Sequence, residues 1–121
     1  MTVSVLICDD SNIARKQLRK ALPESWKEYV TFVTNGQEAL DALKAESFDI
    51  LFLDLTMPVL DGFEVLKAIK AEGLQIKTIV VSADLQAEAQ RRVAADGAID
   101  FIRKPTSADI LIEVLTKHEL L

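Results

Sequence analysis

The fold of this 121-residue chain is decided by the segment Ile50-Leu51-Phe52-Leu53-Asp54-Leu55-Thr56-Met57-Pro58-Val59-Leu60-Asp61-Gly62. Its first four residues are large and apolar, which is typical of a strand that is buried on both faces of its sheet. The run ends at Asp54, and the proline and the Asp-Gly pair that follow predict a turn out of the strand into a loop. We therefore expect Asp54 to be an exposed carboxylate on a rigid stem.

Two other apolar runs also end in charged residues. Residues 3–8 lead into Asp9-Asp10, and residues 98–103 lead into Lys104-Pro105. Further apolar segments predict the complete set of strands at residues 3–8, 29–34, 49–53, 76–81 and 98–103. Most of them lack strict alternation of apolar and polar residues, which predicts strands buried on both faces. Amphipathic stretches between them predict helices at residues 11–22, after Asn35-Gly36, and at residues 63–71, 85–95 and 108–117.

Five strand-helix units in succession favour an α/β fold with a doubly wound parallel sheet. Parallel neighbours need crossover connections, and these place helices on both faces of the sheet. Such sheets bind ligands outside the carboxyl ends of their strands. We therefore expect Asp9, Asp10, Asp54 and Lys104 to meet at one edge, with Ser82 at the end of the fourth strand.

This group of side chains suits a divalent cation and a phosphoryl group. Three carboxylates and one ammonium carry a summed charge of −2, which is costly to hold together without a cation. All the ligands are hard oxygens and the lone His118 lies near the C-terminus, so the sequence predicts magnesium and not zinc. Asp54 is then the nucleophile that forms an acyl phosphate, while Lys104 neutralises charge and Ser82 donates its hydroxyl to a phosphoryl oxygen.

Each of these residues also has an ordinary structural explanation. Asp10 with Ser11 could cap a helix, Asp61-Gly62 could be a simple turn, and Lys104 could be a surface lysine. Taken singly, these explanations are favoured. Together they leave unexplained why four strand ends carry complementary polar groups.

Composition limits the class of protein further. The length fits one domain over residues 1–121, and 50% hydrophobic with 27% charged residues is the balance of a globular chain. We expect a cytoplasmic protein without a membrane span, because no apolar run approaches the ~20 residues a span requires. The net charge of −5 argues against direct nucleic-acid binding, and the single Cys8 is expected to be a small apolar strand residue.

These motifs resemble those of the receiver domains of two-component response regulators, the CheY-like family, over essentially the whole chain. The resemblance rests on the acidic pair Asp9-Asp10, on Asp54 with Met57-Pro58 and Asp61-Gly62, on Ser82-Ala83, and on Lys104-Pro105. It implies a flavodoxin-like sheet of five strands in the order 2-1-3-4-5 flanked by five helices. It also implies a signalling switch that promotes its own phosphorylation and slow dephosphorylation, and not a multiple-turnover enzyme.

The resemblance assigns roles to individual residues. Asp54 would accept the phosphoryl group, and Asp9, Asp10, Asp54 and the backbone carbonyl of Thr56 would bind Mg²⁺, for which Mn²⁺ could substitute. Asp10 is favoured as the direct ligand beside Asp54. The remaining assignments are Lys104 to the phosphoryl oxygens, Ser82 and Phe101 to the conformational switch, Thr56 and Asp84 to the tuning of hydrolysis, and Pro105 and Gly62 to structural support of the site.

This sequence departs from the commonest family pattern at two positions. Ser82 stands where threonine is more usual, which keeps the hydroxyl. Phe101 stands where tyrosine is frequent, so no output through a phenolic hydroxyl is expected, and Phe101 serves equally well as a core residue. The bond Lys104-Pro105 is at a position that is often cis in the family.

The resemblance also implies partners. The phosphoryl group would come from a phosphohistidine on a sensor histidine kinase or a histidine phosphotransfer protein. The surface formed by residues 85–95, 98–103 and 108–117 would bind an output partner or a fused effector domain. The chain is expected to be either a free-standing chemotaxis-type regulator or a receiver cut from a longer protein, as a monomer or a phosphorylation-dependent homodimer.

Two other functions remain open from the residues alone. Haloacid dehalogenase-like phosphatases also use a strand-end aspartate with magnesium, but they place a second Asp two residues later, where this chain has Thr56. An interaction scaffold that works without phosphorylation is the other alternative. The presence of the whole set of polar residues counts against it.

Overall fold

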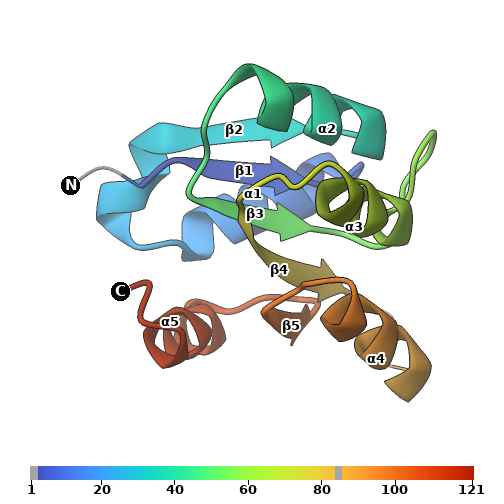
Figure 1. Cartoon of the computed structure of the whole chain (residues 1–121). Helices are drawn as coiled ribbons and strands as arrows, with labels where there is room; N and C mark the ends of the chain where they lie inside the picture. The colour runs from blue at the N-terminus through green and yellow to red at the C-terminus, as the bar shows by residue number, and fades with distance from the viewer. Residues whose placement is uncertain (1–2, 84–85) are drawn as a thin grey trace.

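The computed structural model describes residues 3–83 and 86–121. Its strands and helices alternate along the chain: β1 (Val5–Cys8), α1 (Asn12–Ala21), β2 (Val30–Val33), α2 (Gly36–Ala45), β3 (Ile50–Leu53), α3 (Gly62–Ala71), β4 (Lys77–Ser82), α4 (Ala87–Ala95), β5 (Asp100–Arg103) and α5 (Ala108–Lys117). A short 3₁₀ helix, η1 (Glu24–Tyr29), lies between α1 and β2. All four strand pairings are parallel and the order is β2-β1-β3-β4-β5, which confirms the predicted sheet (Figure 1).

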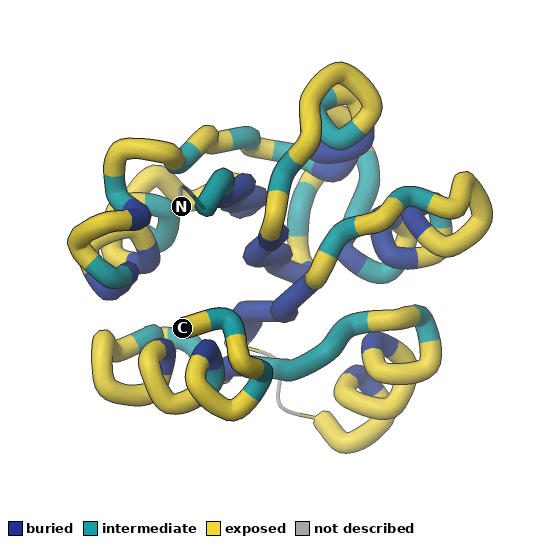
Figure 2. Tube along the Cα trace, turned by 60° about the vertical axis from the view of Figure 1, so that its left-hand side comes forward, coloured by how far each residue is buried: buried dark blue, intermediate teal, exposed yellow. Residues whose placement is uncertain are grey.

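The helices form two layers because side chains alternate along each strand. In β1, Val5 and Ile7 pack in one core cluster with residues of α1 and α5. Leu6 and Cys8 point to the opposite face and pack with residues of α2, α3 and α4. The central strands therefore lie between two layers of helices, and Figure 2 shows buried segments inside a largely exposed outer surface.

Side-chain caps fix where the helices at the site begin. The Ser11 hydroxyl accepts a hydrogen bond from the Ala14 backbone N–H at 3.2 Å, which confirms the predicted cap of α1. Asp61 and Glu64 form a capping box at the start of α3. The polar loops after β1 and β3 are thus tied directly to the helices that follow them.

The edge strands differ from the prediction. We expected every strand to be buried on both faces, but β2 has no buried residue and Phe32 is 39% exposed. A strand at the edge of a sheet has a neighbour on one side only, and the helix layers cover it incompletely. Tyr29, expected at the start of this strand, belongs to η1, which the sequence pattern did not predict.

Two smaller features concern the connections between elements. Trp26 in η1 is 4% exposed and packs in the core with residues of α1 and α5. The predicted helix at 85–95 begins at Ala87 in the structure, and its first expected residue, Leu85, lies outside the described residues. Over the part of the chain that the structure describes, no helix is both long and apolar enough to cross a membrane.

Candidate functional site

The ends of β1 and β3 bring three carboxylates together. Cys8 and Leu53 are register partners, so Asp9 and Asp54 follow adjacent strands at the same level. The Asp54 backbone N–H donates to the Cys8 carbonyl at 3.0 Å, which continues the ladder through the site. Carboxylate oxygens of Asp9, Asp10 and Asp54 all lie within 4.8 Å of one another.

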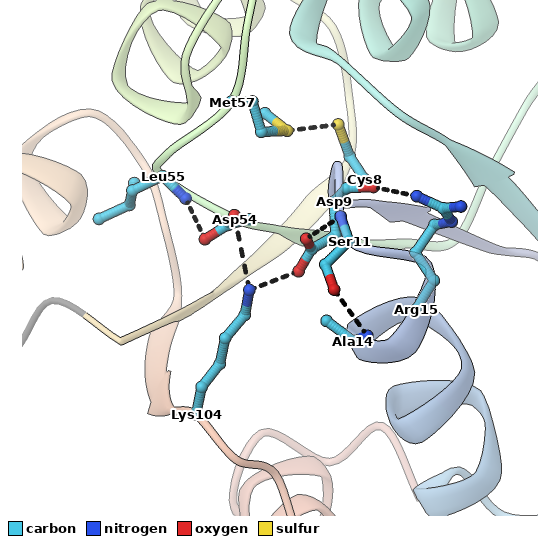
Figure 3. Close-up of polar contacts among 9 residues, drawn as sticks. All are labelled: Cys8, Asp9, Ser11, Ala14, Arg15, Asp54, Leu55, Met57 and Lys104. Carbon is cyan, nitrogen blue, oxygen red and sulfur yellow. Dashed lines mark hydrogen bonds and ion pairs between the residues drawn. The ribbon is translucent and has the colours of Figure 1, made fainter.

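Lys104 brings a cation to this group from the end of β5. Its Nζ lies 2.6 Å from Asp9 Oδ2 and 3.5 Å from Asp54 Oδ2 (Figure 3). The Lys104 backbone N–H donates to the Ser82 carbonyl at 3.0 Å, and the following Lys104-Pro105 bond is cis. Three acids and one ammonium from separate strands therefore form one cluster.

The acids of the cluster differ in burial, and the expectation of an exposed Asp54 was wrong. Asp54 is 6% exposed and Asp9 is 5% exposed, whereas Asp10 lies on the surface. The chain also returns closely after β3: a Cβ on Gly62 would lie 2.3 Å from the Asp54 carbonyl oxygen. The start of α3 therefore packs against the Asp54 backbone, and a glycine at position 62 permits that approach.

Burial and neighbouring charges shift the pKa of both partners of the Asp54–Lys104 ion pair. Burial raises the pKa of the Asp54 carboxyl, and the nearby Asp9 carboxylate raises it further, while Lys104 and backbone N–H groups act in the opposite direction. For Lys104, burial alone would lower the pKa, but the hydrogen bond to Asp9 and the charges of Asp54 and Asp9 raise it. Lys104 therefore stays charged at neutral pH, and Asp54 carries a charge whose cost a further cation would reduce.

The donor set fits a hard divalent cation. Mg²⁺ binds oxygen at about 2.0–2.1 Å, so two oxygens on opposite sides of one ion lie about 4 Å apart. The 4.8 Å limit of the carboxylate cluster is close to this distance, and Mg²⁺ commonly retains waters that bridge a remaining gap. Asp9, Asp10 and Asp54 supply oxygens only, which favours Mg²⁺ over softer metals.

The other predicted site residues that the structure describes lie on β4, on β5 and in the loop after β3. Ser82 is the last residue of β4 and is buried, and Thr56 is exposed in the loop after β3. Phe101 is half-buried in β5, where it pairs with Val80 and borders a cavity of about 210 Å³ beside α4. Asp84, predicted to tune hydrolysis, lies outside the described residues.

Arg15 contacts the site but was not predicted from the sequence. Its Nη1 donates to the Asp9 backbone carbonyl at 2.7 Å (Figure 3). The only signal in the sequence is an arginine close to the start of a helix that directly follows two acids. Arginine is so common on helix surfaces that this position alone indicates nothing.

Comparisons with known proteins agree with the fold and identify the family. The family model of the response regulator receiver domain matches residues 5–116. The chemotaxis protein CheY of Bacillus subtilis is 35% identical over 117 residues, which are 97% of this chain and 98% of that protein. The protein-glutamate methylesterase/protein-glutamine glutaminase of Azospirillum brasilense is 38% identical over 108 residues, which are 87% of this chain but 27% of that protein.

Solved structures of a receiver domain and of a CheY protein share this fold. The chemotaxis protein CheY4 of Vibrio cholerae superposes with a TM-score of 0.85 at 26% identity, covering 97% of this chain and 98% of that chain. The receiver domain of the Francisella response regulator 1452 superposes with a TM-score of 0.82 at 29% identity, covering 98% and 99%. Receiver domains are phosphoryl-accepting signalling switches that interact with histidine kinases or phosphotransfer proteins, and they generally bind Mg²⁺ at an acidic pocket. This chain belongs to the family of response regulator receiver domains.

Proposed function

We propose that this protein is a Mg²⁺-dependent signalling switch that accepts a phosphoryl group on Asp54 from a phosphohistidine donor. The observation that carries the proposal is the convergence of three carboxylates and Lys104 within one cluster at the strand ends. Asp54 is the member that follows the central strand β3 and contacts Lys104 from the end of β5. Its neighbours Asp9 and Asp10 would hold the cation with it, together with the backbone carbonyl of Thr56.

The chemistry follows from the charges of these groups. An oxygen of Asp54 forms a bond to phosphorus while the bond from phosphorus to the imidazole nitrogen of the donor breaks, which leaves an acyl phosphate. When bound, Mg²⁺ supplies charge neutralisation for the phosphoryl oxygens. Lys104 exchanges part of its contact with Asp9 and Asp54 for those same oxygens, and the Ser82 hydroxyl donates to one of them.

The product changes the local charge and so drives the switch. A phosphoryl group adds close to two negative charges and three acceptor oxygens at the end of β3. Lys104 and Ser82 respond from the ends of β5 and β4, and Phe101 turns inward in the expected family manner. To convert a largely inactive population into a largely active one, phosphorylation must favour the active form by a few kcal/mol.

Hydrolysis of the acyl phosphate is expected to be slow. The position two residues after Asp54 holds Thr56, which cannot act as the general acid and base that a phosphatase of the haloacid dehalogenase type requires. Water then attacks the acyl phosphate without a dedicated base, and Thr56 and Asp84 would tune the rate of hydrolysis, as the family resemblance implies. We therefore expect self-dephosphorylation but no steady turnover of phosphate esters.

Similarity to CheY proteins over nearly their whole length supports a chemotaxis-type role for this chain. Its input partner would be a sensor histidine kinase or a histidine phosphotransfer protein. Its output partner would bind the face formed by α4, β5 and α5, whose exposed apolar residues include Ile110 and Ile112.

The proposal is tested by weighing the intact protein after treatment with acetyl phosphate, with Mg²⁺ or with a chelator. We expect added phosphoryl mass in wild type with Mg²⁺, and none with the chelator or in Asp54→Asn. The variant Asp61→Asn is the matched control, because Asp61 caps α3 on the same loop and we expect it to gain the mass. Undiminished mass gain in Asp54→Asn would end the proposal, and steady phosphate release from a phosphomonoester would favour the phosphatase alternative.

A further inference from the structure

One cation beside the acidic cluster has no part in the mechanism above. Arg15 lies in α1, and its Nη1 donates to the Asp9 backbone carbonyl at 2.7 Å while its Nη2 lies 3.3 Å from Asn12 Oδ1. The side chain thus joins the first turns of α1 to the end of β1. Its position is unusual, because a positive charge near a helix N-terminus is disfavoured by the helix dipole, and α1 has no acidic residue in its first turn.

The hydrogen bond from Arg15 is accepted by the backbone carbonyl of Asp9, and not by its carboxylate. The Asp9 carbonyl belongs to the peptide that links Asp9 to Asp10, so a donor on it fixes the orientation of that peptide plane. The orientation of this plane sets the direction in which the Asp10 carboxylate leaves the backbone. The Asp9 side chain is held separately, by Lys104 Nζ at 2.6 Å and by the Ser11 backbone N–H at 2.9 Å.

The environment of the guanidinium strengthens the contact. Its Cζ lies 5.8 Å from the centroid of the Phe32 ring in β2, within the range of a cation–π interaction. Arg15 Nε is buried and has no hydrogen-bond partner among the described residues, so this one nitrogen has been removed from water, although the residue as a whole is half-buried. Phe32, which is 39% exposed on the edge strand, thereby gains a role as one wall of the Arg15 site.

We propose that Arg15 is a positioning residue for the divalent-cation site, which orients the Asp9–Asp10 peptide so that the Asp10 carboxylate reaches the ion. This inference rests on the proposed function, because it assumes that Asp9, Asp10 and Asp54 bind the cation. Arg15 would not itself bind the ion or the phosphoryl group, because its hydrogen bonds go to the Asp9 carbonyl and to Asn12. It acts through the backbone of the acidic pair, as outer contacts of metal ligands commonly do.

Two effects of Arg15 on the cation have opposite signs, and this makes the proposal testable. If Arg15 acted only by its charge, it would repel a divalent ion, and its removal would raise the affinity for Mg²⁺. If it acts by positioning, its removal lowers the affinity even though a repelling charge is lost. Loss of an outer contact of this kind typically costs roughly 10- to 100-fold in metal affinity.

The experiment is a titration of each protein with Mg²⁺ by calorimetry and with Mn²⁺ by electron paramagnetic resonance, without any phosphodonor. We expect the dissociation constant to rise roughly tenfold in Arg15→Gln and by less in Arg15→Lys, which keeps the charge but not the two-nitrogen fork. The control is Lys16→Gln, which removes one exposed charge from the same helix turn and is expected to leave the constant unchanged. Unfolding of the metal-free variants in urea verifies that each protein is folded at the titration temperature.

The outcomes separate this inference from the proposed function. If wild type binds neither Mg²⁺ nor Mn²⁺, the proposed function itself fails. If wild type binds and Arg15→Gln binds as tightly as Lys16→Gln, or more tightly, the positioning role is overturned while the proposed function stands. Kinetics with acetyl phosphate give a second criterion: saturating Mg²⁺ should restore the phosphorylation rate of Arg15→Gln, and a rate that stays low would contradict positioning of the ion site.

Discussion

The central strands β1 and β3 and the edge strands β2 and β5 are built differently, although all four are four residues long. Every residue of β1 and β3 is buried, whereas Ile102 alone is buried among the residues of β2 and β5. The acids of the site follow the two central strands, and Lys104 follows an edge strand. The comparison teaches that the proposed phosphoryl acceptor and metal ligands follow the two strands that are buried along their whole length.

The edge of the sheet carries the groups that are expected to move or to meet partners. Lys104, Phe101 and the face formed by α4, β5 and α5 all belong to the β5 side. Their burial is partial, so rearranging them exposes or buries little of the core. Under the proposed function, this separation would let the charge at Asp54 change without unfolding the strands that hold it.

The largest expected contrast is between two phenylalanines. Phe52 in β3 is 1% exposed and Phe32 in β2 is 39% exposed. Phe52→Ala should lower the free energy of unfolding by about 3–5 kcal/mol, because it leaves a cavity in the centre of the core. Phe32→Ala should cost about 1 kcal/mol. Urea unfolding measures both, and equal losses would contradict the division between centre and edge.

A second contrast tests the close packing after β3. In Gly62→Ala the new Cβ meets the Asp54 carbonyl oxygen and the Leu55 Cα at 2.3 and 2.8 Å, which are backbone atoms that cannot turn away. We expect a loss of about 1–3 kcal/mol in the free energy of unfolding, together with slower phosphorylation by acetyl phosphate. In Gly73→Ala the Cβ has open space and only the positive φ of 65° is strained, so phosphorylation should be unaffected. A Gly62→Ala protein with wild-type stability would show that the loop is loosely packed.

The charge of Asp54 should destabilise the metal-free protein. Because burial and Asp9 raise its pKa, the neutral carboxyl contributes stability that is complete at low pH and is lost as pH rises through the raised pKa. In a chelating buffer at neutral pH, Asp54→Asn should therefore unfold at higher urea concentration than wild type, and the difference should disappear in acid. Added Mg²⁺ should stabilise wild type more than the variant. A less stable Asn variant at neutral pH would mean that the ion pair with Lys104 outweighs burial.

The smallest expected effect is at the start of β5. Asp100 Oδ2 lies 2.7 Å from His118 Nε2 and 3.6 Å from Lys117 Nζ, which ties the edge strand to the end of α5. Burial alone would raise the pKa of Asp100, but the hydrogen bonds from His118 and the Phe101 N–H and the charge of Lys117 lower it. Its contribution is therefore present at neutral pH and lost as pH falls through the lowered pKa.

Asp100→Asn should thus lower the stability at neutral pH by less than about 1 kcal/mol, since the pair is partly exposed. Its stability should also fall less steeply than that of wild type in acid, below about pH 4. Urea unfolding across this pH range measures both effects. A loss as large as that of Phe52→Ala would show that the edge is held as firmly as the centre.

Much of the difference between the central strands and the edge strands could be predicted from the sequence. Continuous apolar runs at β1 and β3 indicate strands that are buried on both faces. The charged residues that follow these runs could therefore be predicted to lie at the carboxyl ends of the strands. Once the strands were parallel, the meeting of Asp9, Asp10, Asp54 and Lys104 followed from topology. The edge strand β2 misled the prediction, because Val30, Thr31 and Phe32 have strand propensity whether or not helices cover them.

Features that depend on how distant segments pack against one another could not be predicted from the sequence. Asp54 looked exposed because a charged residue after a strand usually is, and its 6% exposure depends on how distant segments pack around the strand end. Arg15 acts on a carbonyl oxygen, which every residue possesses, so no pattern of residue types marks the contact. The surface at α4, β5 and α5 that we propose for a partner depends on shape and exposure, for which one sequence holds little information.

The most direct test of the central claim locates the acceptor itself. The protein is phosphorylated with acetyl phosphate and Mg²⁺, the acyl phosphate is reduced with borohydride to homoserine, and the modified residue is identified by tandem mass spectrometry of peptides. The structure predicts homoserine at position 54 alone, at the end of the buried strand β3. Homoserine at Asp9 or Asp10, or at no position in protein that has gained phosphoryl mass, would contradict the assignment of Asp54 as the phosphoryl acceptor.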